Sequence, residues 1–438
     1  MADSVFKVIP GVQSYAWGKK GTLSLAAQFG SICIPGFEID DNKTYAELWM
    51  GTHPTLPTKL PDETLLPDHL KSHPELIGSG VASRFEDCKD GSLPFLFKVL
   101  SIGTALSIQA HPDKKLARKL FDERPTVYKD PNHKPEMAIA LSPFLAFLNF
   151  LPLPILLLHF LTVPELGPLV PFSLTESLAS SLDLPTTRPP NVSLYQSVTS
   201  SPTTKQKEIL KETFNALISA DKELVDVAIS KLVRRYEKRQ DIKENEKGLV
   251  ELTLMLNRQY PNDVGVLCVF MLNVIELKRG EAVFLGANEP HAYIRGDIIE
   301  CMATSDNVVR AGLTPKYRDV STLVSMLTYE AGPGNKQLLQ PTLFQPDDES
   351  TKLYNPPIEE FSVLRIELAK GTKATHRKVE GPSLAVVTEG KGAVSVSGTQ
   401  KKIELQRGEV IFLGAGSAVE WEAFENIEIF RAFVEAGK

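Results

Sequence analysis

The sequence predicts an α+β protein that is mainly β, with a block of helices interrupting the strands. Three observations support this fold class. The first 150 residues alternate short apolar runs with turns, residues 205–240 repeat apolar side chains at helical spacing, and short strands return from about residue 264 onward. A chain of 438 residues has room for about two to three domains. We therefore expect a helical insertion within or between two β regions.

Apolar runs define the strands expected in the N-terminal region. Residues 93–102 read LPFLFKVLSI and residues 104–110 read TALSIQA, with Gly and Pro in the connections. The next segment, residues 137–164, contains no charged residue and is long enough to cross a bilayer. Four prolines and the polar residues Asn149 and His159 interrupt it. We therefore expect a buried strand, a turn and the start of a helix there rather than a membrane span.

Helical periodicity is clearest in the middle of the chain. A segment rich in Pro, Ser, Thr and Leu, residues 164–202, leads into it. Apolar side chains then recur every three or four positions through residues 205–240. A further helical pattern, GLVELTLMLNRQY, ends at Pro261. Short strand patterns occupy the remainder.

Composition excludes several classes of function. The chain carries 48 basic and 54 acidic residues, a net charge of −6, so nothing attracts it to a nucleic acid backbone in general. Its four cysteines are far apart and form no CxxC motif, which argues against a disulfide framework or a thiolate zinc site. No signal peptide pattern opens the sequence, and no heptad run demands a dimer. We expect a cytoplasmic monomer that contacts neither nucleic acid nor membrane.

A long-period duplication gives the best structural clue. Residues 279–287 read RGEAVFLGA and residues 407–415 read RGEVIFLGA, which differ at only two positions. In the first copy Gly280 precedes His291 by eleven residues, a spacing that resembles the second cupin motif and its metal-binding histidine. The equivalent of His291 in the second copy is Val419. We therefore expect two cupin-type β-barrel or jelly-roll cores, with the chemistry in the first.

These patterns set the expected domain boundaries. The first, metal-binding β domain would comprise residues 1–152 and 262–330, the helical insertion residues 153–261, and the second β domain, without metal ligands, residues 331–438.

Candidate metal ligands lie in the first copy. In SIQAHPDKK, Gln109 and His111 are two residues apart and would project from the same face of a strand. Glu136 and His291 would complete a set of one Gln, two His and one Glu, donors that suit a divalent ion such as zinc. From spacing alone, a Gln-x-His pair is more often structural, so this pattern leaves both interpretations open.

A basic cluster follows in NVVRAGLTPK, residues 307–316. Arg310 offers a planar fork for a phosphate or enediolate oxygen, whereas Lys316 offers a point charge. A solvated turn between strands is the alternative interpretation of the same residues.

Taken together, the motifs identify a family. The chain resembles the type I mannose-6-phosphate isomerases along nearly its whole length, through the collinear blocks YAWG (15–18), YAELWMGTHP (45–54), LPFLFKVLS (93–101), LSIQAHPDK (106–114), NHKPEMAIAL (132–141), PHAY (290–293), ECMA–SDN–VRAGLTPK (300–316) and YNPP (354–357). The resemblance implies a zinc-dependent isomerase that interconverts mannose 6-phosphate and fructose 6-phosphate through a cis-enediol. Its product would supply GDP-mannose and glycan synthesis.

The resemblance also implies the site. One zinc ion per chain would be held by Gln109, His111, Glu136 and His291. The family pattern makes Arg310 the active-site arginine and places around the substrate Lys134, Glu300, Lys316, Ser107 and Tyr293. The two N-terminal blocks would line or support the pocket through Trp17, Glu47 and Trp49. One departure is that Asn149 stands where the family has a turn glycine, and the charges that usually follow are absent.

The sequence does not decide which side chain transfers the proton. Glu300 is the first choice for the acid/base, with His133 and Lys134 as competitors beside Glu136. Arg310 would stabilise the enediolate. Lys316 and Ser107 would bind the phosphate.

Two other functions are alternatives. A cupin metal-dependent oxygenase fits a Gln ligand and a basic pocket less well. A sugar-phosphate-binding cupin without turnover would be expected to have lost some of the ligands or Arg310, and all are present.

Overall fold

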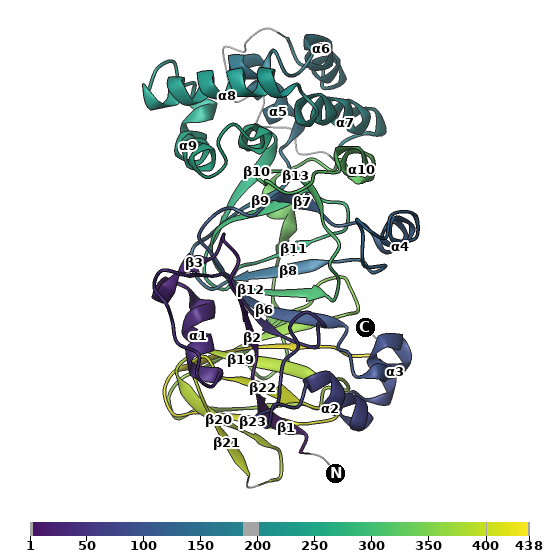
Figure 1. Cartoon of the computed structure of the whole chain (residues 1–438), viewed down its shortest axis with the longest axis vertical. Coiled ribbons are helices and arrows are strands. Elements are labelled where there is room, and N and C mark those ends of the chain that lie inside the picture. Colours follow the sequence, from purple (N-terminus) through teal and green to yellow (C-terminus); the bar gives the residue numbers. More distant parts are fainter. Residues whose placement is uncertain (1–2, 187–200, 400, 437–438) are drawn as a thin grey trace.

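The structure, a computed structural model, describes residues 3–186, 201–399 and 401–436. The molecule is elongated, with helices α5 to α9 at one end, the strands of the C-terminal repeat at the other, and the first β repeat between them (Figure 1). The predicted class, mainly β with a helical insertion, is confirmed. One detail differs from the predicted β-barrel or jelly-roll cores. The strands of the described residues form open sheets that face one another and do not close into barrels.

The strands of the N-terminal and central regions have these bounds: β1 Val5–Val8, β2 Gly11–Gln13, β3 Lys19–Lys20, β4 Thr44–Tyr45, β5 Glu47–Met50, β6 Phe95–Ile102, β7 Ile108–Ala110, β8 Glu136–Ala140, β9 Phe144–Phe150, β10 Leu272–Leu277, β11 Ala282–Leu285, β12 His291–Ala303 and β13 Val309–Gly312. Those of the C-terminal region are β14 Leu338–Leu339, β15 Thr342–Leu343, β16 Thr351–Tyr354, β17 Ser362–Leu368, β18 Lys373–His376, β19 Ser383–Glu389, β20 Lys391–Val396, β21 Lys402–Gln406, β22 Val410–Leu413, β23 Val419–Ala423 and β24 Ile427–Phe433.

The α-helices are α1 Leu25–Cys33, α2 Leu66–Ser72, α3 Ser79–Arg84, α4 Lys114–Glu123, α5 Leu153–Thr162, α6 Phe172–Ser181, α7 Thr204–Ile218, α8 Lys222–Glu237, α9 Val250–Gln259 and α10 Val320–Met326. A 3-10 helix, Val264–Phe270, precedes β10, where the sequence led us to expect a strand. Its residues are all buried, so the local apolar run does not distinguish the two structures.

The duplication extends to strand pairing. In the first repeat the hydrogen-bonded strands of one layer have the order β6-β12-β8-β11. The strand β12 continues into the facing layer, where the order is β7-β12-β9-β10. The second repeat has the same orders, β17-β24-β19-β22 and β18-β23-β20-β21. The matching turns before β11 and β22 both require a left-handed glycine, Gly280 with φ +83° and Gly408 with φ +93°. The long, bent β12 thus corresponds to the two strands β23 and β24.

The two repeats pack face to face through β6, β12 and β8 on one side and β17, β19, β22 and β24 on the other. Alternate residues of the first repeat's strands contact the second repeat through one apolar cluster that includes Phe95, Phe97, Val99, Ile299, Cys301, Val363, Val386, Phe412 and Phe430. The intervening residues point to the opposite face, toward the interior of the first repeat. Every residue of β6 is therefore buried.

The N-terminal strand crosses between the repeats. β1 pairs with β22 at the edge of the C-terminal sheet, with Val5 opposite Leu413. The pairing covers an edge of the C-terminal sheet with a segment from the start of the chain (Figure 1).

The uncharged segment 137–164 folds into two buried strands and a helix, β8, β9 and α5. Asn149 adopts φ +51°, the left-handed conformation that glycine favours and asparagine tolerates. The turn expected there is instead a bulge within β9, where the register with β10 shifts. No helix within the described ranges is both long enough and apolar enough to span a membrane.

A buried ion triad holds the helical block together. The guanidinium of Arg235 on α8 binds the carboxylates of Glu165 at 2.8 Å and Glu246 at 2.6 Å. The Tyr236 hydroxyl donates to Glu246 at 2.9 Å. Because both carboxylates are buried, the guanidinium compensates charges that water does not reach.

Arg235→Met should lower the free energy of unfolding by about 3 kcal/mol, because it leaves two buried carboxylates without a cation. Chemical unfolding followed by circular dichroism measures this change. The neighbouring exposed arginine gives the matched control, and Arg234→Met should change stability by less than about 0.5 kcal/mol. Equal effects of the two variants would contradict a structural role for the triad.

Candidate metal centre and active site

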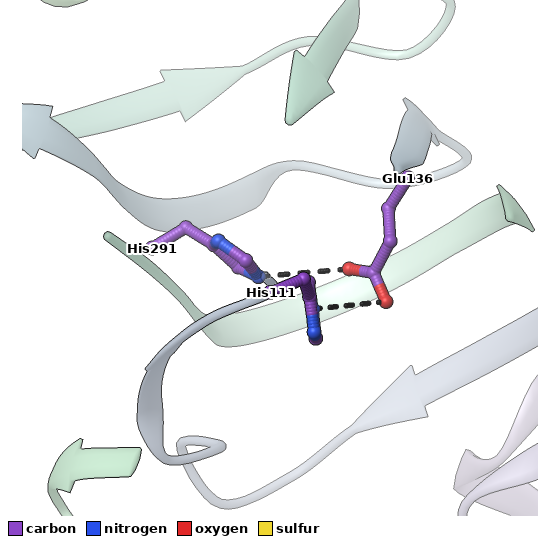
Figure 2. A group of neighbouring side chains, drawn as sticks. All are labelled: His111, Glu136 and His291. Atoms are coloured by element: carbon purple, nitrogen blue, oxygen red, sulfur yellow. Dashed lines mark ion pairs between the residues drawn. The ribbon is translucent and has the colours of Figure 1, made fainter. Parts of the chain in front are cut away.

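Three predicted metal ligands meet inside the first repeat. His111 directly follows β7, Glu136 begins β8 and His291 begins β12. The Nε2 atom of His111 lies 3.3 Å from Oε1 of Glu136, and Nε2 of His291 lies 3.6 Å from Oε2. Both imidazoles point toward the one carboxylate (Figure 2). All three side chains are buried, and their ligand atoms lie within 4.8 Å of one another.

The protons on these imidazoles are fixed by the backbone. Nδ1 of His111 lies 2.6 Å from the Asn307 carbonyl, and Nδ1 of His291 lies 3.1 Å from the Glu289 carbonyl. A carbonyl only accepts, so each Nδ1 carries the proton and each Nε2 presents a lone pair. Neither Nε2 has a hydrogen-bond partner of acceptable geometry among the described residues. Burial lowers the pKa of His111 to about 4, which keeps it neutral.

Two lone pairs and a carboxylate therefore face one another with no proton between them. Burial raises the pKa of Glu136, but the positive charge of Lys134 beside it acts in the opposite direction, and the pKa lies well below the usual range. Two imidazole nitrogens and an ionised carboxylate are a donor set that suits a borderline divalent metal such as zinc. These residues fit a metal ion.

Strand register places Gln109 beside them. Gln109 on β7 lies opposite His291 on β12 and opposite Arg310 on β13. Residues directly opposite in antiparallel pairs share a face, so the three side chains form a row across three strands. The Ser107 hydroxyl donates a hydrogen bond to the side-chain amide oxygen Oε1 of Gln109 at 3.1 Å.

A cavity of about 660 Å³ opens onto this row. Its walls include most of the predicted site residues, namely Trp17, Glu47, Trp49, Ser107, Gln109, Lys134, Glu136, Tyr293, Glu300, Arg310 and Lys316. Arg310 is partly buried, burial lowers its pKa, and it forms no ion pair with a carboxylate of the described ranges. Its guanidinium is therefore available to an anionic ligand.

Tyr293 lies between Glu136 and Glu300, two of the carboxylates that line the cavity. Its hydroxyl is 3.4 Å from Oε2 of Glu136, and it also hydrogen-bonds Glu300. Burial raises the pKa of Glu300, and the nearby negative charge of Glu136 adds to this, whereas Lys98 opposes it. Lys134 lies 3.2 Å from Oε1 of Glu136. The neighbouring carboxyl groups of Glu136 and Glu300 thus have pKa values shifted in opposite directions.

Comparison with known proteins places this site in a family. Models of type I phosphomannose isomerase match residues 5–153 (catalytic domain), 190–272 (helical insertion domain) and 352–399 (C-terminal). The chain is 72% identical to a mannose-6-phosphate isomerase of Cryptococcus neoformans over the whole of both chains.

The chain belongs to the type I phosphomannose isomerases. A Candida albicans mannose-6-phosphate isomerase is 41% identical over 99% of this chain and 100% of its own. Among solved structures, a zinc-bound mannose 6-phosphate isomerase is 29% identical and aligns with a TM-score of 0.78 over 99% of this chain and 100% of its own. The apo enzyme of Salmonella typhimurium aligns equally well, at 29% identity, the same TM-score and the same coverage.

Three predicted site residues of this phosphomannose isomerase family member are not among the residues that line the cavity. Two of them, the metal ligands His111 and His291, lie against Glu136, which does line it. His133 is not among the described lining residues, and its Nε2 lies 2.6 Å from Oε1 of Glu360. Glu360 lies just before β17 in the C-terminal repeat. The contact ties the loop that leads into Glu136 to the second repeat.

Lys98 is the residue that sequence reasoning missed. Its ammonium group lies 3.0 Å from Glu300 and 3.4 Å from Glu47, and 5.1 Å from the centre of the Trp49 ring. The Trp49 indole N–H donates to Glu47. Burial alone would lower the pKa of Lys98, but the two carboxylates outweigh it and raise the pKa. The only sequence signal was a single lysine within the apolar run LPFLFKVLS.

Lys98→Met should lower the free energy of unfolding by about 3 kcal/mol at neutral pH, because it leaves two buried carboxylates without their cation. Burial already raises the pKa of Glu300, and removing its cation raises it further, so the loss grows as pH rises and shrinks as the carboxyl group becomes protonated. Urea unfolding at pH 7.5 and pH 5 measures it.

The exposed Lys59–Glu63 pair provides the control, and Lys59→Met should cost less than about 1 kcal/mol at both pH values. A pH-independent loss in Lys98→Met would contradict the electrostatic explanation.

Proposed function

We propose that this chain is a zinc-dependent mannose-6-phosphate isomerase that interconverts D-mannose 6-phosphate and D-fructose 6-phosphate. The observation that carries the proposal is the buried cluster of His111, His291 and Glu136, whose ligand atoms lie within 4.8 Å of one another beside a cavity that Arg310 and Lys316 also line. The names of the full-length relatives and the zinc in one solved neighbour support it.

Gln109, His111, Glu136 and His291 would hold the metal. When bound, zinc supplies a Lewis acid that polarises the oxygens on C1 and C2 of the open-chain sugar without changing its own oxidation state. The backbone carbonyls of Asn307 and Glu289 keep the two imidazoles in the ligand tautomer.

The reaction moves a proton between C1 and C2 through a cis-enediol, so a group in the cavity must take it up and return it. Glu300 is the best candidate, since it faces the cavity and its raised pKa brings it closer to neutral pH. Lys98 and Tyr293 position it. His133 is less suitable because it does not line the cavity, and Lys134 because its ammonium group lies against the metal ligand Glu136.

Arg310 would stabilise the negative charge that develops on the enediolate, since no protein carboxylate of the described residues neutralises it. Ser107 and Lys316 on the cavity wall would bind the phosphate, and Trp17 and Glu47 would shape the pocket.

The cellular role follows from the same reaction. Mannose 6-phosphate made here would supply GDP-mannose and glycan synthesis, and we propose that the enzyme acts as a cytoplasmic monomer. We also propose the three domains set out above, with the helical insertion in residues 153–261. The described helices α5 to α9, which all lie between the paired strands β9 and β10, support that division.

A coupled assay of fructose 6-phosphate formation from mannose 6-phosphate tests the function. The purified chain is assayed untreated, after chelation and after zinc is restored. We expect activity to fall at least about tenfold with chelator and to return with zinc. Activity that persists in metal-free protein would overturn the zinc assignment. A folded, zinc-loaded but inactive protein would favour a sugar-phosphate-binding role.

Arg310→Ala should retain zinc, measured by atomic emission, and lose about 10²-fold or more in kcat, because it removes charge stabilisation of the enediolate. Arg118→Ala, which removes an exposed arginine of α4 paired with Asp122, is the control and should keep wild-type activity. Near-normal turnover in Arg310→Ala would remove that residue from the mechanism.

A further inference from the structure

The duplication allows the active-site positions to be located in the second repeat. Leu285 pairs with Glu136 in the first repeat, and its counterpart Leu413 pairs with Ser383 in the second. Ser383 therefore occupies the place of Glu136. By the same register Val419 replaces His291, as the sequence repeat already indicated. Two of the metal ligands have become a hydroxyl and an alkyl group.

A histidine stands at the position of Gln109, but both of its nitrogens are engaged. His376 lies opposite Val419, as Gln109 lies opposite His291. Its Nδ1 accepts from the Trp421 indole N–H at 3.2 Å, and its Nε2 lies 3.0 Å from the Thr351 hydroxyl. Burial lowers the pKa of His376 to about 3, so the ring is neutral. This imidazole has no lone pair left for a metal.

The position of Glu300 is filled by a residue of opposite charge. Glu300 pairs with Ala138, two residues beyond Glu136, and Arg431 pairs with Ala385, two residues beyond Ser383. Arg431 thus stands where the first repeat has its proposed acid/base. Its Nη2 donates to the Ser383 hydroxyl at 2.8 Å.

Arg431 is a buried cation that the rest of the protein leaves incompletely satisfied. The side chain has no solvent exposure, and its Nε and Nη1 have no hydrogen-bond partner among the described residues. The carboxylate whose negative charge acts on Arg431 is that of Glu435, and Glu435 is itself paired with Arg377 at 2.7 Å. Burial lowers the pKa of Arg431 to about 9, so it stays charged at neutral pH. A buried charge of this kind calls for a counterion.

We propose that the second repeat binds a small monovalent inorganic anion of halide size against the unpartnered edge of the Arg431 guanidinium, beside the Ser383 hydroxyl. A single cation calls for a single negative charge, and Nε and Nη1 each have N–H groups available to donate to it. Arg431 and Ser383 are both fully buried, so an ion bound there would be shielded from solvent. The two repeats therefore hold ions of opposite charge at equivalent places.

Bromide locates the site in the intact protein. Crystals of the wild-type chain are soaked in sodium bromide, and anomalous data are collected at the bromine absorption edge. We expect a peak within hydrogen-bonding distance of the Arg431 guanidinium and the Ser383 hydroxyl. A water molecule there, with no anomalous peak, would overturn the proposal.

Solution measurements separate this site from the substrate cavity. The Tm of the wild-type chain is measured in sodium chloride, sodium bromide and sodium gluconate at equal ionic strength. We expect a saturable rise in Tm with the two halides and not with the larger gluconate. Arg431→Met should lose this rise, whereas Lys373→Met, which removes an exposed charge from the same repeat, should keep it.

Ser383→Ala covers the case in which Arg431→Met does not fold. It keeps the cation but removes the hydroxyl, and should move the midpoint of the halide effect to at least threefold higher concentration. A halide response in Arg431→Met or Ser383→Ala equal to that of the wild type would place the anion elsewhere and overturn the proposal.

Discussion

The burial of β6, β8 and β12 on both faces is the constraint on which the site depends. One face of these strands packs against the second repeat, so every other residue must be apolar, as Phe97 and Ile299 are. The alternate residues face the interior of the first repeat, and Lys98, Glu136 and Glu300 occupy that register. The second repeat thus contributes to the site without lining it, because it fixes the sheet from which the polar side chains project.

Charged side chains on the buried face of a sheet are stable only when groups of opposite charge lie beside them. Lys98 neutralises Glu47 and Glu300, and Lys134 lies against Glu136. The lone pairs of the two imidazoles remain unsatisfied in this arrangement, which is what a metal site requires before the metal binds. The same pairing rigidifies the cavity, since each charged group has little freedom to leave its partner.

The sequence predicted the elements better than their assembly. Helical periodicity identified α7, α8 and α9, and the RGE repeat marked the turns before β11 and β22. The sequence could not show that β1 joins the sheet of the second repeat, because strand pairing between residues some 400 positions apart leaves no local pattern. For the site, family motifs supplied the candidate residues, most of which line one cavity. The role of Lys98 was missed because its partner Glu300 lies 202 residues away.

The two repeats show how one architecture accommodates opposite chemistry. Equivalent register positions hold Glu136 and Glu300 in the first repeat, but Ser383 and Arg431 in the second. Each set is buried among apolar neighbours on an identical order of strands. Strand pairing depends on the backbone and on the apolar register, so it is unaffected by which polar side chains stand at these few interior positions. The constraint that remains is electrostatic, because the buried charges of each interior need a partner of opposite sign.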